Sequence, residues 1–262
     1  MLSQGALAPR RRACGRAGPL AIMRGMPSAS KRPSSAARLE RRAAWYRDVR
    51  GEPRNGLRWL PEVRGWQAQR LRRSLAPLLE RPDRAAAADF FLAEVYGGRD
   101  DDRRDADMLR VMPMMARLLP APLAGTLAHA IELGALSHAL DLRMAEALQR
   151  LAPRRRRLDE ALYAEAYRAV GRVRLRGHQI DLIGAVADGL AGAVALPGAG
   201  RLLRMSRPAA RLAGVGRLQD FLERGYAAFE GLDDPAGFIE AIQCGERALS
   251  RRLFAAAPRP FG

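Results

Sequence analysis

The chain has 262 residues, of which 48% are hydrophobic and 28% are charged, a composition typical of a globular protein rather than of a disordered one. Aromatic residues make up only 6% of the chain, which disfavours β-sandwiches and β-barrels, because these folds depend on aromatic and β-branched side chains. The two cysteines, Cys14 and Cys244, exclude a disulfide scaffold and a cysteine-rich zinc module.

The basic charge has two readings. The formal net charge is +17 at pH 7, and Lys31 is the one lysine among 45 basic residues. Such a charge is typical of proteins that bind nucleic acid or an anionic surface. A genome rich in G and C also encodes many arginines and few lysines, whatever the protein does. Nucleic-acid binding is therefore an alternative that the composition alone does not favour.

The basic residues cluster in two segments. Residues 1–36 contain seven of them and no acidic residue, among prolines, serines and glycines without apolar periodicity. We expect a disordered tail here, or a coding start placed too early, since Met23 and Met26 follow. Arg154–Arg157 form the second cluster, in the linker after Pro153.

From residue 37 onward, apolar residues recur almost without interruption at helical spacing. Helices are expected at about residues 37–50, 57–80, 84–96, 102–119, 123–151, 158–175, 176–196, 207–229 and 233–254. Prolines and glycines punctuate these segments, as helix termini require. The pattern predicts an all-α fold: a single domain of eight or nine helices, residues 37–257, packed as an irregular bundle.

No apolar stretch reaches the roughly 20 residues that a membrane-spanning helix needs. We therefore expect no membrane span and, by default, a cytoplasmic protein with reduced cysteines. Its partners are unknown from the sequence, and homo-oligomerisation stays open.

The familiar catalytic motifs are missing. There is no phosphate-binding loop, no Gly-x-Ser-x-Gly elbow and no Cys-x-x-Cys pair, and Gly198-Ala199-Gly200 follows a helix rather than a strand. His129 and His138 each precede an acidic residue by three positions, but the two pairs point to opposite faces of one predicted helix. We therefore expect no metal site and no cofactor.

Polar residues on predicted apolar helix faces give the candidate site. They are Asp141, Arg176, Glu94, Arg104, Gln179, His138 and Glu246. Burying an unpaired charge is costly, so these residues need partners. Two interpretations follow: a buried polar network that links helices, or a ligand pocket or active site built from the same residues.

Asp141 lies in the middle of the apolar face of the longest predicted helix. An arginine is the expected partner, because its planar fork matches a carboxylate, and Arg176 and Arg104 are the candidates. In a closed network, the substitution Asp141→Asn would destabilise the fold by about 3–5 kcal/mol.

Residues 90–97 read FFLAEVYG and residues 103–107 read RRDAD. These segments resemble an uncharacterised proteobacterial family in which the pattern FFL-x-D-x-YG precedes RRDAD, and the similarity extends over about residues 85–255. Glu94 stands where that family has Asp. The resemblance implies a domain of unknown function, so it does not indicate any activity, cofactor or substrate. It selects the same candidate residues Glu94, Arg104, Asp141, Arg176 and Gln179.

Three functions remain. The first is a helical domain that acts through binding or assembly, with a buried polar network. The second is a metal- or small-ligand-dependent enzyme with a site in the helical core. The third is association with nucleic acid through the arginine-rich segments.

Overall fold

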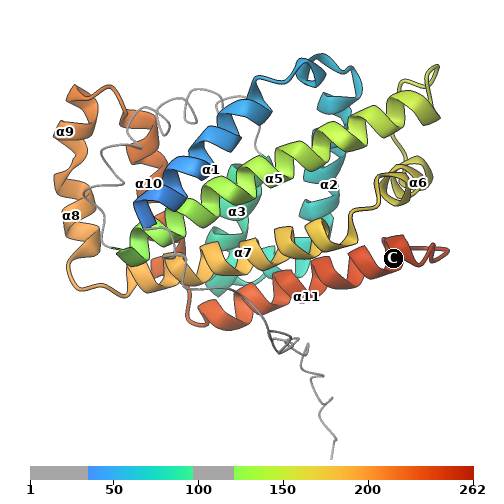
Figure 1. The fold of residues 1–262 in the computed structure, drawn as a ribbon. Coiled ribbons are helices and arrows are strands. Elements are labelled where there is room, and N and C mark those ends of the chain that lie inside the picture. Colours follow the sequence, from blue (N-terminus) through green and yellow to red (C-terminus); the bar gives the residue numbers. More distant parts are fainter. Residues whose placement is uncertain (1–34, 97–120) are drawn as a thin grey trace, which may run out of the picture. The chain divides into compact units, whose positions relative to one another are not determined.

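The computed structural model describes residues 35–96 and 121–262, which contain ten α-helices, one short 3-10 helix and no strand. The all-helical prediction is thereby confirmed (Figure 1). The helices are α1 (Ser35–Arg50), α2 (Trp59–Leu79), α3 (Pro82–Tyr96), α5 (Ala121–Leu151), α6 (Glu160–Val170), α7 (Val173–Val194), α8 (Ala199–Met205), α9 (Arg207–Leu212), α10 (Gly216–Glu230) and α11 (Pro235–Phe254). The 3-10 helix η1 (Pro53–Gly56) joins α1 to α2. The predicted helix at 102–119 and almost all of the predicted tail lie outside the described residues.

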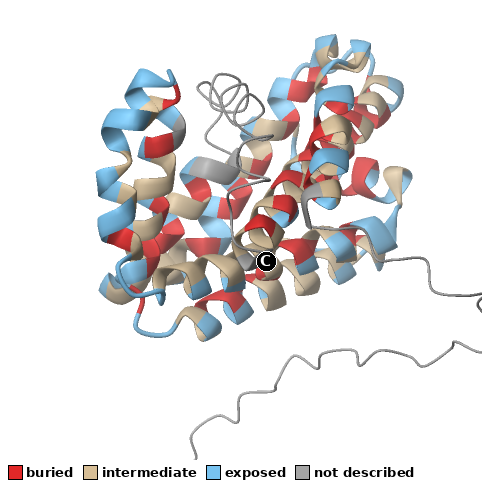
Figure 2. Ribbon diagram, turned by 60° about the vertical axis from the view of Figure 1, so that its left-hand side comes forward, coloured by how far each residue is buried: buried red, intermediate tan, exposed pale blue. Residues whose placement is uncertain are grey.

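Helix α5 is the centre of the packing. Helices α1, α2, α6 and α7 all contact it, and α11 packs on the other side of α7 (Figure 1). Small side chains such as Ala128, Ala135 and Ala145 are buried along α5, which allows its neighbours to approach closely. Figure 2 shows buried residues where helices face one another and exposed residues on the outer faces.

Two apolar clusters account for most of the core. The first gathers around Trp59, Met144 and Leu148, where α2, α5, α6 and α11 meet. The second gathers around Leu71 and Phe238, between α2, α3, α7, α10 and α11. Phe90 and Phe91 are partly buried against the second cluster.

Two helix boundaries differ from the prediction because of left-handed backbone. Gly171 and Arg172 have φ values of 65° and 61°, so α6 ends at Val170 and α7 begins at Val173 rather than at residue 176. Gly214, with φ of 69°, divides the predicted helix 207–229 into α9 and α10. Glycine tolerates this conformation without the steric cost that other residues bear. The short helix α8 occupies a stretch that was predicted to be a break.

Among the described helices, none is by itself both long and apolar enough to cross a membrane. Helices α7 and α8 would reach that length and hydropathy only together, and they are bent by 89° relative to each other.

Candidate functional site

Helices α2, α5, α6, α7 and α11 contribute polar side chains to one region of the core. Helix α5 carries Asp141 and His138, α7 carries Arg176 and Gln179, and α11 carries Glu246. Five of the seven predicted candidates therefore lie in the described core. Glu94 belongs to α3, but its side chain is outside the described part of the chain, as is the whole of Arg104.

Asp141 is buried, and its closest contacts come from α2. The Gln67 amide donates a hydrogen bond of 3.1 Å to Oδ1, and Arg64 Nε lies 4.0 Å from Oδ2. Burial raises the pKa of Asp141 to about 6, although the charges of Arg176 and Arg64 and the Gln67 hydrogen bond act in the opposite direction. Among the described arginines, Arg64 contacts Asp141, whereas the expected partner Arg176 acts on it only through its charge; Arg104, the other expected partner, lies outside the described residues.

His138 is tied to α2 and to the loop that follows α1. Its Nδ1 contacts Arg64 Nη2, and its Nε2 lies 2.7 Å from the Asn55 side-chain oxygen. A guanidinium only donates hydrogen bonds, so Nδ1 must accept and Nε2 must carry the proton. Asn55 in turn donates to the carbonyls of Arg50 and Glu52, which anchors the loop. Both ring nitrogens of His138 are therefore occupied within the protein.

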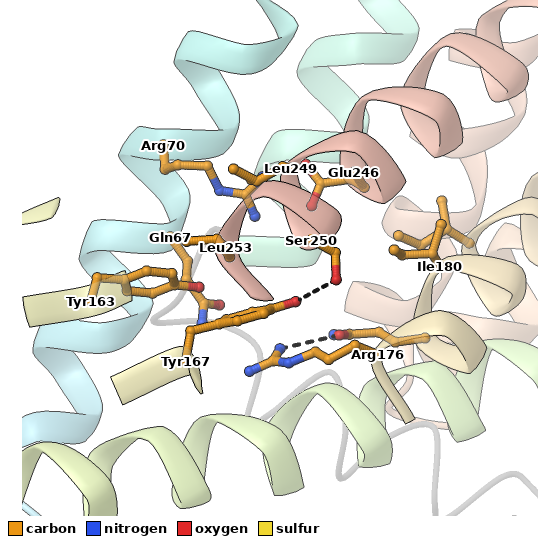
Figure 3. A pocket seen from close by; sticks show the side chains of 12 residues that line it. Gln67, Arg70, Tyr163, Tyr167, Arg176, Ile180, Glu246, Leu249, Ser250 and Leu253 are labelled. Atoms are coloured by element: carbon orange, nitrogen blue, oxygen red, sulfur yellow. Dashed lines mark hydrogen bonds and ion pairs between the residues drawn. The ribbon is translucent and has the colours of Figure 1, made fainter. Parts of the chain in front are cut away.

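Arg176 is buried and contacts Gln179 and Tyr167. Its Nη1 donates to Gln179 at 3.3 Å, and the Gln179 amide donates to the Ser137 hydroxyl at 2.8 Å. The guanidinium also lies 4.6 Å from the centre of the Tyr167 ring, a cation–π contact that Figure 3 shows from the side. Its Nε and Nη2 have no hydrogen-bond partner among the described residues.

Glu246 forms an ion pair with Arg70 that joins α11 to α2, and both side chains are largely buried. Beside it, the Tyr167 hydroxyl lies 3.0 Å from the Ser250 hydroxyl, which joins α6 to α11. Figure 3 shows these groups around one small space.

Sequence reasoning missed the contribution of α2 and α6. Gln67 and Arg70 follow Leu60 and Val63 at helical spacing, so they fall on the same apolar stripe. As polar residues on an apolar helix face, both residues could have been predicted from the sequence. Tyr163 and Tyr167 gave no such signal, because tyrosines at helical spacing are ordinary core residues.

A cavity of about 40 Å³ lies between these side chains, lined by residues of α2, α6, α7 and α11 (Figure 3). Tyr163 is one of the residues that line it, and burial raises the pKa of Tyr163 to about 12. A water molecule in the liquid occupies about 30 Å³, so this space holds one or two waters.

In the two described stretches of the chain, no three side chains of His, Cys, Asp or Glu converge as a metal site would require. The carboxylates of the core face arginines and amides instead, as the contacts of Asp141 and Glu246 illustrate.

Comparison with known proteins places the chain in a family. None of the curated proteins and none of the solved structures matches it. One family model matches residues 46–260, a wider range than the resemblance at 85–255. The chain belongs to that family, which is described as a domain of unknown function (DUF8198).

Proposed function

We propose that this domain acts through binding or assembly, and that its polar core is a structural network rather than a site for chemistry. The observation that carries the proposal is the size of the central cavity, about 40 Å³, among residues that mostly bond to one another. Pockets that enclose small-molecule ligands have volumes of about 300–1,000 Å³.

The charges of the core support the same reading, because each of its two described carboxylates, Asp141 and Glu246, has an arginine nearby. Arg70 forms an ion pair with Glu246. The partly exposed Arg64 contacts Asp141, and the charge of the buried Arg176 lowers the pKa of Asp141. A catalytic residue needs an atom that is free to exchange a proton with the substrate. Both ring nitrogens of His138 are instead bonded to residues of α2 and of the loop after α1. Each of these contacts crosses between helices, so the network specifies how the helices pack.

Native mass spectrometry of protein purified without a metal-binding tag tests this proposal. The expected mass is that of the polypeptide alone, because a cavity of about 40 Å³ among the described residues is far smaller than the sites that enclose small-molecule ligands. A stoichiometric additional mass that is retained in Arg247→Met but lost in Arg70→Met would overturn the proposal. The two variants are matched, since each breaks an ion pair that joins α11 to another helix. The pair of Arg247 with Asp181, however, is on the surface.

A further inference from the structure

Helices α8 and α9 lie beside α10 (Figure 1). They present apolar side chains to solvent. Leu202 is 71% exposed, Met205 is 66% exposed and Leu212 is 91% exposed. Leu202 and Met205 are three residues apart, so they share one face of α8. We call the exposed side chains of residues 201–212 the α8–α9 surface.

The opposite face of these two helices is fixed to α10. Gly200 is buried so close to the Tyr226 ring that an added Cβ would lie 2.8 Å from it. The Ser206 hydroxyl and the Gln219 amide are hydrogen-bonded, at 3.1 Å, and Gln219 also donates to the Leu203 carbonyl at 2.6 Å. The side chains of Leu202, Met205 and Leu212 therefore lie on the outer face of elements that are already packed, where they remain exposed among the described residues.

The α8–α9 surface is also cationic. The sequence has five arginines and no acidic residue between Asp188 and Asp220. Arg207 forms a bidentate ion pair with Glu223 of α10. Hydrogen bonds from Arg207 and Gln219 lower the pKa of Glu223 to about 2. Arg201, Arg204 and Arg211 are exposed among the leucines.

The alternation of arginine and apolar residues distinguishes the kinds of partner. Arginine and methionine also occur in protein interfaces, but a protein partner would need an acidic residue opposite each of these arginines and apolar residues between them. Nucleic acid would neutralise the arginines but leave the leucines in water. At the surface of an anionic bilayer, by contrast, arginines reach the phosphates while leucine and methionine enter the boundary of the acyl chains.

We propose that the α8–α9 surface binds the surface of membranes that contain anionic lipids. This inference rests on the proposed function, since it names the partner through which the domain acts. Electrostatic attraction brings the arginines to the lipid headgroups, and insertion of Leu202, Met205 and Leu212 strengthens the attachment.

Co-sedimentation of the full chain with lipid vesicles tests this proposal. We expect binding to vesicles of phosphatidylcholine mixed with phosphatidylglycerol, little binding to phosphatidylcholine alone, and weaker binding as salt is raised. The substitution Leu202→Glu should lower the affinity about tenfold or more, because it removes an inserted side chain and adds a negative charge.

Val173→Glu is the matched control, since Val173 begins α7, is 60% exposed and lies between Arg172 and Arg174. It changes the net charge by the same amount and should leave vesicle binding at the wild-type level. The basic residues of 1–36 and Arg154–Arg157 are present in both variants, so they cannot cause a difference between the two.

Several results would overturn the assignment to lipid. Equal vesicle binding by Leu202→Glu and the wild type would locate the contact elsewhere on the protein. A dimer that light scattering detects in the wild type but not in Leu202→Glu would make a second copy the occupant. Binding to mixed-sequence RNA without binding to vesicles would make nucleic acid the partner. None of these results adds the mass of a bound small molecule or metal to the polypeptide, so the proposal of a structural core stands or falls separately.

Discussion

Replacing Asp141 by asparagine is expected to stabilise the protein by about 3 kcal/mol at pH 8 and to change its stability little at pH 4. Burial raises the pKa of Asp141 from 3.8 to about 6, so the folded state favours the neutral carboxyl. Between these two values the unfolded chain binds fewer protons than the folded one, and the free energy of unfolding falls as the pH rises. Above pH 6 the loss is complete, and one pKa unit corresponds to about 1.4 kcal/mol.

Asparagine resembles the neutral form of Asp141 and keeps an oxygen that accepts the Gln67 hydrogen bond. Urea denaturation of wild type and variant at pH 4, 6 and 8 measures the difference, most of which should develop between pH 4 and pH 6. Asp181→Asn on the exposed side of α7 is the control and should show no comparable trend. A loss of about 3–5 kcal/mol at pH 8 would mean that Asp141 is ionised and paired, as the sequence alone predicts.

The substitution Arg70→Met is expected to cost about 3 kcal/mol of stability, because it leaves the Glu246 carboxylate in the core without its cation. We place the effect at the lower end for buried ion pairs, since the Glu246 side chain retains 18% exposure. The double variant Arg70→Met/Glu246→Leu should recover most of this loss, because apolar residues of similar volume replace a buried ion pair at little cost.

A double-mutant cycle measured by urea denaturation isolates the interaction. The pair of Arg247 with Asp181 serves as a control on the surface and should contribute less than about 1 kcal/mol. If the double variant is as unstable as Arg70→Met alone, Arg70 stabilises the core through other contacts, and Glu246 is not its main partner.

Most of the helices follow from apolar periodicity and from proline. Pro153 lies in the linker between α5 and α6, and Asp234-Pro235 begins α11, where the Asp234 carboxylate accepts the Gly237 amide at 2.8 Å. The breaks at Gly171 and Gly214 were missed, because glycine alone does not reveal a left-handed backbone. Gly177, Gly184, Gly189 and Gly192 all lie inside α7, so the residue type is the same in both situations.

The charged residues that α5, α7 and α11 contribute to the candidate site were predictable from the sequence, but their pairing was not. Asp141, Arg176 and Glu246 interrupt apolar stripes, and a helical wheel reveals such interruptions. Which arginine faces which carboxylate depends on how far each helix is shifted along its neighbour. That shift is set by the packing of many side chains, so Asp141 meets Arg64 and Glu246 meets Arg70.

A crystal structure that resolves ordered water would test most directly whether the polar core is a structural network or a ligand site. We expect about one or two waters in the cavity, hydrogen-bonded to the polar side chains that line it, with Arg70 and Glu246 in contact. Density for an organic molecule or a metal ion between Tyr163, Ser250 and Glu246, in a cavity enlarged by moved side chains, would contradict it and make the polar core a ligand site.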